Sequence, residues 1–100
     1  MNADIKSKWI AALSQYRQTH HKLSSARGKK YCCLGVLCLV VGADRETWEH
    51  RGFPPRRILD AVKLTEDEAW VLVELNDGDI DGNVRRHTFA EIADYIKEHL

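Results

Sequence analysis

The amino-acid sequence predicts an α+β fold that is mostly helical. We expect about four helices around a buried central strand and helix at residues 31–42, together with a small β-hairpin. Residues 31–42 hold the longest apolar run of the 100-residue chain. The segments on either side are amphipathic with the period of a helix, so they need an apolar partner. This length suits one domain, which we place at residues 1–100.

The first helix is expected at residues 4–17. Ile5, Trp9, Ala12, Leu13 and Tyr16 recur at helical spacing and form one apolar stripe, and Asp4 is a candidate N-cap. The polar stretch that follows contains a glycine turn signal at position 28. It predicts a hairpin in which residues 22–24 pair with residues 30–32.

The central run predicts a strand at about residues 30–33 and a buried helix at about 34–41. Gly35 lowers helix propensity but would let a neighbouring element approach closely, and Gly42 supplies a stop signal. The run provides the predicted core, which consists of Cys32, Cys33, Leu34, Leu37 and Cys38.

The C-terminal half carries the clearest helix signals. Pro54 and Pro55 end an irregular segment, and a short helix is expected at residues 56–64. Thr65 and Thr88 each begin a Thr-x-x-Glu capping box, which predicts two further helices. Among the aromatic residues, Trp48, Phe53 and Trp70 are the candidates for an exposed interaction patch.

Composition indicates an ordinary globular protein, with 44% hydrophobic and 30% charged residues. The N-terminus has no apolar segment of the signal-peptide type, and the central run is about half of what a membrane helix requires. We therefore expect a cytoplasmic protein with no membrane association. Three cysteines are an odd number and two are adjacent, so reduced, buried thiols are expected.

The zero net charge conceals an unequal distribution. Residues 1–57 hold eleven Lys and Arg against four Asp and Glu, whereas residues 58–100 hold four against eleven. Such halves can each present a face to a partner. The candidate binding residues are therefore charged and belong to the basic segments or the acidic loop: Lys22, Arg27, Lys29, Lys30, Arg56, Arg57, Asp77, Asp79 and Asp81.

The acidic loop resembles the first positions of an EF-hand calcium loop. Asp77, Asp79 and Asp81 alternate and are followed by Gly82. The loop departs from that motif at its twelfth position, where Thr88 replaces the bidentate glutamate, and Arg85 adds a positive charge. We favour a plain acidic loop without a cofactor, and calcium binding is the alternative.

No enzyme is predicted. The Cys-Cys-x-x-x-x-Cys arrangement of Cys32, Cys33 and Cys38 differs from the Cys-x-x-Cys spacing typical of structural zinc sites. A thiol nucleophile needs a lowered pKa and an adjacent base, and none of the five histidines lies in a setting that suggests one. Phosphate-binding glycine loops and serine elbows are also absent from the sequence.

The sequence resembles a group of small uncharacterised proteins encoded by bacteriophages and prophages. That group has an early Trp-x-x-x-Leu helix, an aromatic-Cys-Cys-Leu-Gly-Val-Leu-Cys run, a Leu-Asn-Asp and a Phe-x-Glu-Ile-Ala-Asp helix. Here these motifs lie at residues 9–13, 31–38, 75–77 and 89–94, and Leu39 stands where the pattern usually has Asp.

The resemblance implies a viral accessory protein in the cytoplasm of the host cell. Such a protein would act by stoichiometric binding to a host protein or small ligand, for example to inhibit a defence system. A nucleic-acid-binding regulator that uses the basic segments is the alternative.

Overall fold

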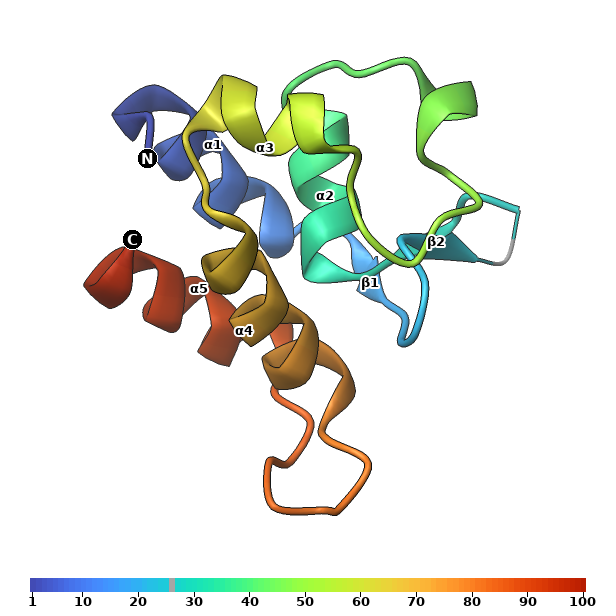
Figure 1. Ribbon diagram of the computed structural model, residues 1–100, viewed down its shortest axis with the longest axis vertical. Helices are drawn as coiled ribbons and strands as arrows, with labels where there is room; N and C mark the ends of the chain where they lie inside the picture. Colours follow the sequence, from blue (N-terminus) through green and yellow to red (C-terminus); the bar gives the residue numbers. More distant parts are fainter. Residues whose placement is uncertain (26) are drawn as a thin grey trace.

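The computed structural model describes residues 1–25 and 27–100 and confirms a mostly helical α+β fold (Figure 1). Its elements, in chain order, are α1 (Ala3–Leu13), β1 (Arg17–Gln18), β2 (Ser24–Ser25), β3 (Lys30–Tyr31), α2 (Cys33–Val40), the 3-10 helix η1 (Arg45–Thr47), α3 (Arg56–Val62), α4 (Glu66–Asp77) and α5 (Phe89–His99).

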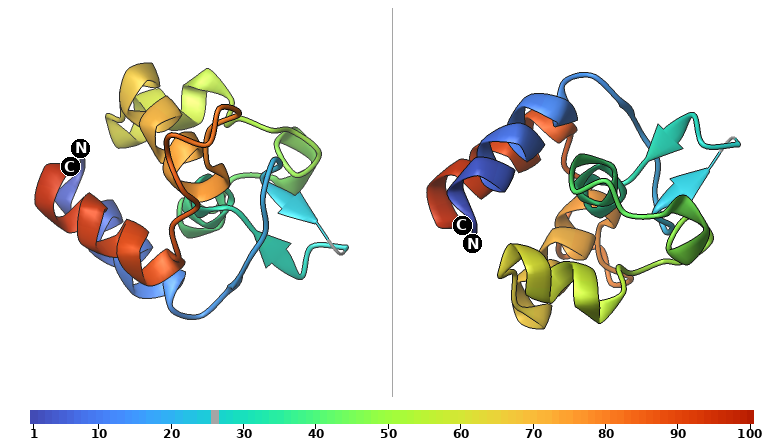
Figure 2. Two further views of the ribbon diagram at one scale, coloured as in Figure 1. Left: turned by 90° about the horizontal axis from the view of Figure 1, so that it is seen from below. Right: turned by 90° about the horizontal axis from the view of Figure 1, so that it is seen from above.

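Helix α2 lies at the centre of the molecule. Figure 2 shows α1 and α5 on one side of it, the sheet on another, and α3 and α4 on a third. Its residues 33–38 are all buried, as expected for a helix that is apolar nearly all round. The predicted core residues Cys32, Leu34 and Leu37 therefore lie where the sequence placed them, and so do the other two cysteines.

The strand before α2 is shorter than predicted, and the helix begins one residue earlier. β3 ends at Tyr31, and Cys32 acts as the N-cap of α2, with its Sγ accepting a hydrogen bond from Gly35 N at 3.4 Å. Because Cys32 caps the helix and Cys33 is its first residue, neither residue can continue the strand. Gly42 follows the helix with φ +70°, as the predicted stop requires.

Gly35 allows the close approach that the sequence predicted. A Cβ at this position would lie 2.0 Å from the carbonyl oxygen of Leu23. Leu23 precedes β2, and its carbonyl also accepts a hydrogen bond from Cys32 N at 3.1 Å. The hairpin backbone therefore rests directly on the first turn of α2.

The hairpin is confirmed with a different register. β2 and β3 are antiparallel and pair Ser24 with Tyr31, one residue away from the predicted pairing. β1 adds a third strand, parallel to β3, in the order β1-β3-β2. The sequence had assigned Arg17, which pairs with Lys30, to the first helix.

Helix α1 differs from the prediction at both ends. It begins at Ala3 because Asn2, in extended geometry, caps it by accepting a hydrogen bond from Ile5 N at 3.1 Å; Asp4 lies in the first turn. It ends at Leu13, since the chain then extends to pair with β3. Tyr16 leaves the helical stripe and packs edge-on against Tyr31, with ring centroids 5.3 Å apart.

The predicted helix at residues 56–64 begins at Arg56 but ends at Val62, because Lys63 adopts a left-handed conformation with φ +59°. Both predicted capping boxes are present, at Thr65 with Glu68 and at Thr88 with Glu91. The buried apolar residues form one cluster shared by all five α-helices. No helix among the described residues has the length and apolar character needed to cross a membrane.

Candidate interaction loop and its anchoring network

The segment between α4 and α5 projects from the rest of the molecule (Figure 1). We call residues 78–87 the acidic loop; Asp77, which the sequence pattern groups with it, is the last residue of α4. Ile80 lies in this loop and is fully exposed, with a relative accessibility of 101%. It is the most exposed of the four large apolar side chains that the described part of the chain leaves accessible.

Hydrogen bonds within the acidic loop hold Ile80 in place. Asp79 N donates to Val84 O at 3.0 Å, and the Asp79 carboxylate accepts from Asn83 N at 2.7 Å. Gly78 and Gly82 both have φ +76°, a conformation that suits glycine at the two turns of such a loop. Ile80 is thus presented on an internally bonded turn.

The base of the acidic loop is tied to both flanking helices. Arg86 Nε donates to Asp77 O at 3.0 Å, and His87 N donates to Leu75 O at 2.7 Å. Arg85 forms a bidentate ion pair with Glu91 of α5. The hydrogen bond from Arg85 is the main cause that lowers the pKa of Glu91 to about 2.

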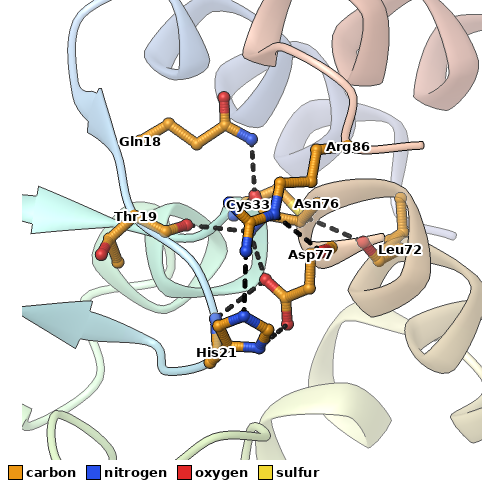
Figure 3. A network of polar contacts seen from close by, with 8 residues as sticks. All are labelled: Gln18, Thr19, His21, Cys33, Leu72, Asn76, Asp77 and Arg86. Atoms are coloured by element: carbon orange, nitrogen blue, oxygen red, sulfur yellow. Dashed lines mark hydrogen bonds and ion pairs between the residues drawn. The ribbon is translucent and has the colours of Figure 1, made fainter. Parts of the chain in front are cut away.

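Asn76 anchors the end of α4 in the protein interior (Figure 3). It is 1% exposed, and its Oδ1 accepts from Gln18 Nε2 at 3.0 Å and from Cys33 N at 3.2 Å. Its Nδ2 donates to Thr19 O at 2.9 Å and to Asp77 Oδ1 at 2.8 Å. One amide therefore joins β1, the start of α2 and the base of the acidic loop.

Asp77 points toward the turn that follows β1 (Figure 3). Its Oδ1 accepts from His21 N at 2.9 Å, and Arg86 Nη2 lies 3.2 Å from His21 Nε2. The neighbouring His20 is partly buried, and burial followed by the charge of Arg86 lowers its pKa. Asp77 thus belongs to the anchoring network.

The three predicted calcium ligands have different roles in the structure. Asp77 binds the turn at His21, Asp79 stabilises the acidic loop, and Asp81 is exposed. Within the described residues, no three His, Cys, Asp or Glu side chains lie close enough to hold a metal ion together.

The six predicted basic residues are divided between two places. Lys22, Arg27, Lys29 and Lys30 are exposed on the hairpin, where Lys22 and Arg27 line a cavity of about 520 Å³. Arg56 and Arg57 belong to α3, on another part of the molecule (Figure 1). Arg56 lies within 4 Å of the carboxylates of Asp60 and Glu66.

Comparison with known proteins places the N-terminal part of the chain in a family. Residues 1–59 match the model described as a domain of unknown function, DUF8296. The chain belongs to this family. No curated protein and no solved structure matches the chain.

The matched DUF8296 stretch runs from α1 to the first residues of α3 and includes α2 with all three cysteines. Burial raises the pKa of Cys32 and of Cys38 to about 12, and it raises that of Cys33 as well. The Cys33 thiol also donates to Leu72 O at 3.7 Å. A thiol with a raised pKa is a weak nucleophile at neutral pH.

We expect the native protein to react slowly with a thiol-specific disulfide reagent at pH 7.5. All three thiols should become reactive in denaturant, because unfolding removes the burial that keeps them protonated. The measurement is the time course of released thiolate with and without guanidinium chloride. Rapid reaction of a single thiol in the native protein would show that one cysteine is accessible and activated.

Sequence reasoning missed two residues of this region in the DUF8296 protein. Asn76 was read as part of a Leu-Asn-Asp motif, although a short amide among apolar helix positions is a signal for a buried polar contact. Ile80 is not among the candidate residues of the sequence analysis. An aliphatic residue between turn-forming aspartates and glycines has no neighbouring apolar residue to pack against, and this was the available signal.

Proposed function

We propose that this protein acts by stoichiometric binding to a host protein, in the manner of a bacteriophage accessory protein, with a defence system as the kind of target. The observation that carries the proposal is the full exposure of Ile80 on the internally bonded acidic loop. Buried apolar anchors surrounded by polar residues dominate the energetics of protein interfaces. The resemblance to phage-encoded proteins suggests the setting, which is the host cytoplasm.

The surroundings of Ile80 indicate what the partner offers. Asp79 and Asp81 flank the aliphatic side chain, and Asp81 is exposed. A complementary surface would combine a small apolar pocket for Ile80 with basic residues at its rim. Opposite charges at the rim would accelerate association and select the partner.

The nucleic-acid alternative has less support. Its six basic residues are split between the hairpin and α3, and Arg56 is paired with acidic residues of this chain. A phosphate backbone would have to meet these positions along one continuous track.

Replacement of Ile80 by Ala is expected to weaken partner binding by about 2 kcal/mol, the cost of truncating an interface anchor. Stability should change by less than about 0.5 kcal/mol, because the side chain contacts solvent. Tagged wild-type protein and the I80A variant are used to capture host proteins, which are quantified by mass spectrometry.

The control is Lys8→Ala, which removes an exposed side chain from α1. The proposal requires a captured protein that is retained with the control and depleted with I80A. Equal recovery of every captured protein with the wild type and I80A would contradict it.

A further inference from the structure

After Ile80, the second large apolar side chain of interest at the surface is Trp70, which belongs to α4. Its side chain is 49% exposed, whereas Trp9 is completely buried. Trp48 is completely buried as well, so its selection as a candidate for an exposed patch is wrong. Trp70 is one of four large apolar side chains that are exposed among the described residues; the others are Tyr16, Val71 and Ile80. Trp70 and Val71 are adjacent on α4, so two of these four side chains lie together on one helix.

Phe53 fixes the orientation of the indole. The two rings are stacked, with centroids 4.4 Å apart and planes 18° apart. Phe53 is half-buried and is followed by two buried prolines, so its backbone has little freedom. One face of the Trp70 ring is therefore covered, and the opposite face is presented to solvent as a flat aromatic surface.

Three carboxylates lie on the same side of α4 as the Trp70 ring. Glu66 and Glu74 lie one helical turn before and after Trp70, and Asp67 lies three residues before it, so all three share its side of α4. Glu66 is 3.7 Å from Arg56. Asp67 and Glu74 are exposed and form no ion pair with a described residue.

We propose that Trp70 is a binding platform for an arginine side chain of the protein partner. A guanidinium group stacks on tryptophan by cation–π attraction and can donate several hydrogen bonds to carboxylates at the same time. Lysine fits this site less well because its ammonium is strongly hydrated and has no planar face. The inference rests on the proposed function and names the partner's side chain.

A neighbouring groove of about 610 Å³ is lined by Phe53 and Glu66 but not by Trp70, and it carries Arg51, Arg56 and Lys63. These basic residues do not favour an arginine-bearing segment, so the proposed platform is confined to the Trp70 ring and the carboxylates on its side of α4.

The fold already contains the same type of contact. The guanidinium carbon of Arg45 lies 5.5 Å from the ring centroids of both Tyr31 and Trp48. This contact is within the chain and partly buried, while Trp70 has an open face.

The test uses a fluorescent peptide of four Gly-Arg repeats, measured by anisotropy at low salt. Trp70→Ala is expected to weaken its binding at least twofold, the lower range for a cation–π contact at an exposed site. Trp70→Phe should retain part of the affinity and keeps the test valid if the alanine variant folds poorly. A matched peptide with citrulline in place of arginine should not bind measurably.

Charge is tested separately with Glu74→Lys, against Glu98→Lys near the end of α5 as the control. The first is expected to weaken binding of the arginine peptide more than the second. Affinity that changes less than twofold in W70A, or equal affinity for the citrulline peptide, would overturn the inference. Peptide binding is measured on the purified protein without any captured partner, so failure here is distinguishable from failure of the host-protein capture.

Discussion

Gly35→Ala is expected to destabilise the protein by about 3 kcal/mol. The new Cβ would lie 2.0 Å from Leu23 O and 2.9 Å from Leu23 C, and both atoms belong to the backbone. Relief requires the hairpin to move away from α2, which stretches the bond from Cys32 N to Leu23 O. Overpacking and a weakened buried hydrogen bond together exceed the gain of about 1 kcal/mol that Ala brings to a helix.

The measurement is denaturant unfolding monitored by circular dichroism. Gly52→Ala serves as the control, because a Cβ there would be an ordinary 3.5 Å from His21 O. If Gly35→Ala were as stable as the wild type, the close packing of the hairpin on α2 would be wrong.

Asn76→Leu is expected to destabilise the protein by about 3–4 kcal/mol. Leucine has a similar volume but leaves Cys33 N and Thr19 O without the hydrogen bonds that the amide supplies. Each buried backbone group left unsatisfied costs about 1–3 kcal/mol. Because the amide also holds Gln18 and Asp77, the loss should extend to the base of the acidic loop.

Unfolding in urea gives the change in free energy, and hydrogen exchange shows where protection is lost. Asn83→Ala, on the exposed part of the acidic loop, is the matched control and should have little effect. Unchanged exchange of the Cys33 amide in Asn76→Leu would show that Asn76 does not act as the anchor described above.

Much of the fold could be predicted because its signals are local. A capping box satisfies backbone groups within four residues, so Thr65 and Thr88 predict the start of their helices without knowledge of the rest of the chain. Gly35 was also informative, since a glycine within an apolar helix has few explanations other than close packing. The continuous burial of residues 33–38 followed from their composition.

The missed features depend on distant partners. Residues 17–18 become a strand only because Lys30 and Tyr31 lie beside them, and no local pattern encodes a parallel pairing of two residues. The choice of Asn2 over Asp4 as the N-cap was equally open, because both residue types cap well. The four partners of Asn76 come from three separate segments.

The candidate site was predicted only in outline. The sequence singled out Asp77, Asp79 and Asp81 by their charge, and the structure gives these three residues three different environments. Side-chain direction after the end of a helix depends on the loop path, which Gly78 and Gly82 determine through their positive φ. The exposure of Ile80 is a consequence of that path.

Isothermal titration calorimetry with the captured host protein tests the central claim most directly. The account predicts a fixed whole-number stoichiometry for the wild type and a dissociation constant about 30-fold higher for I80A, corresponding to about 2 kcal/mol. The stoichiometry should be the same for both. An affinity of I80A equal to that of the wild type would contradict the claim that the acidic loop makes the contact.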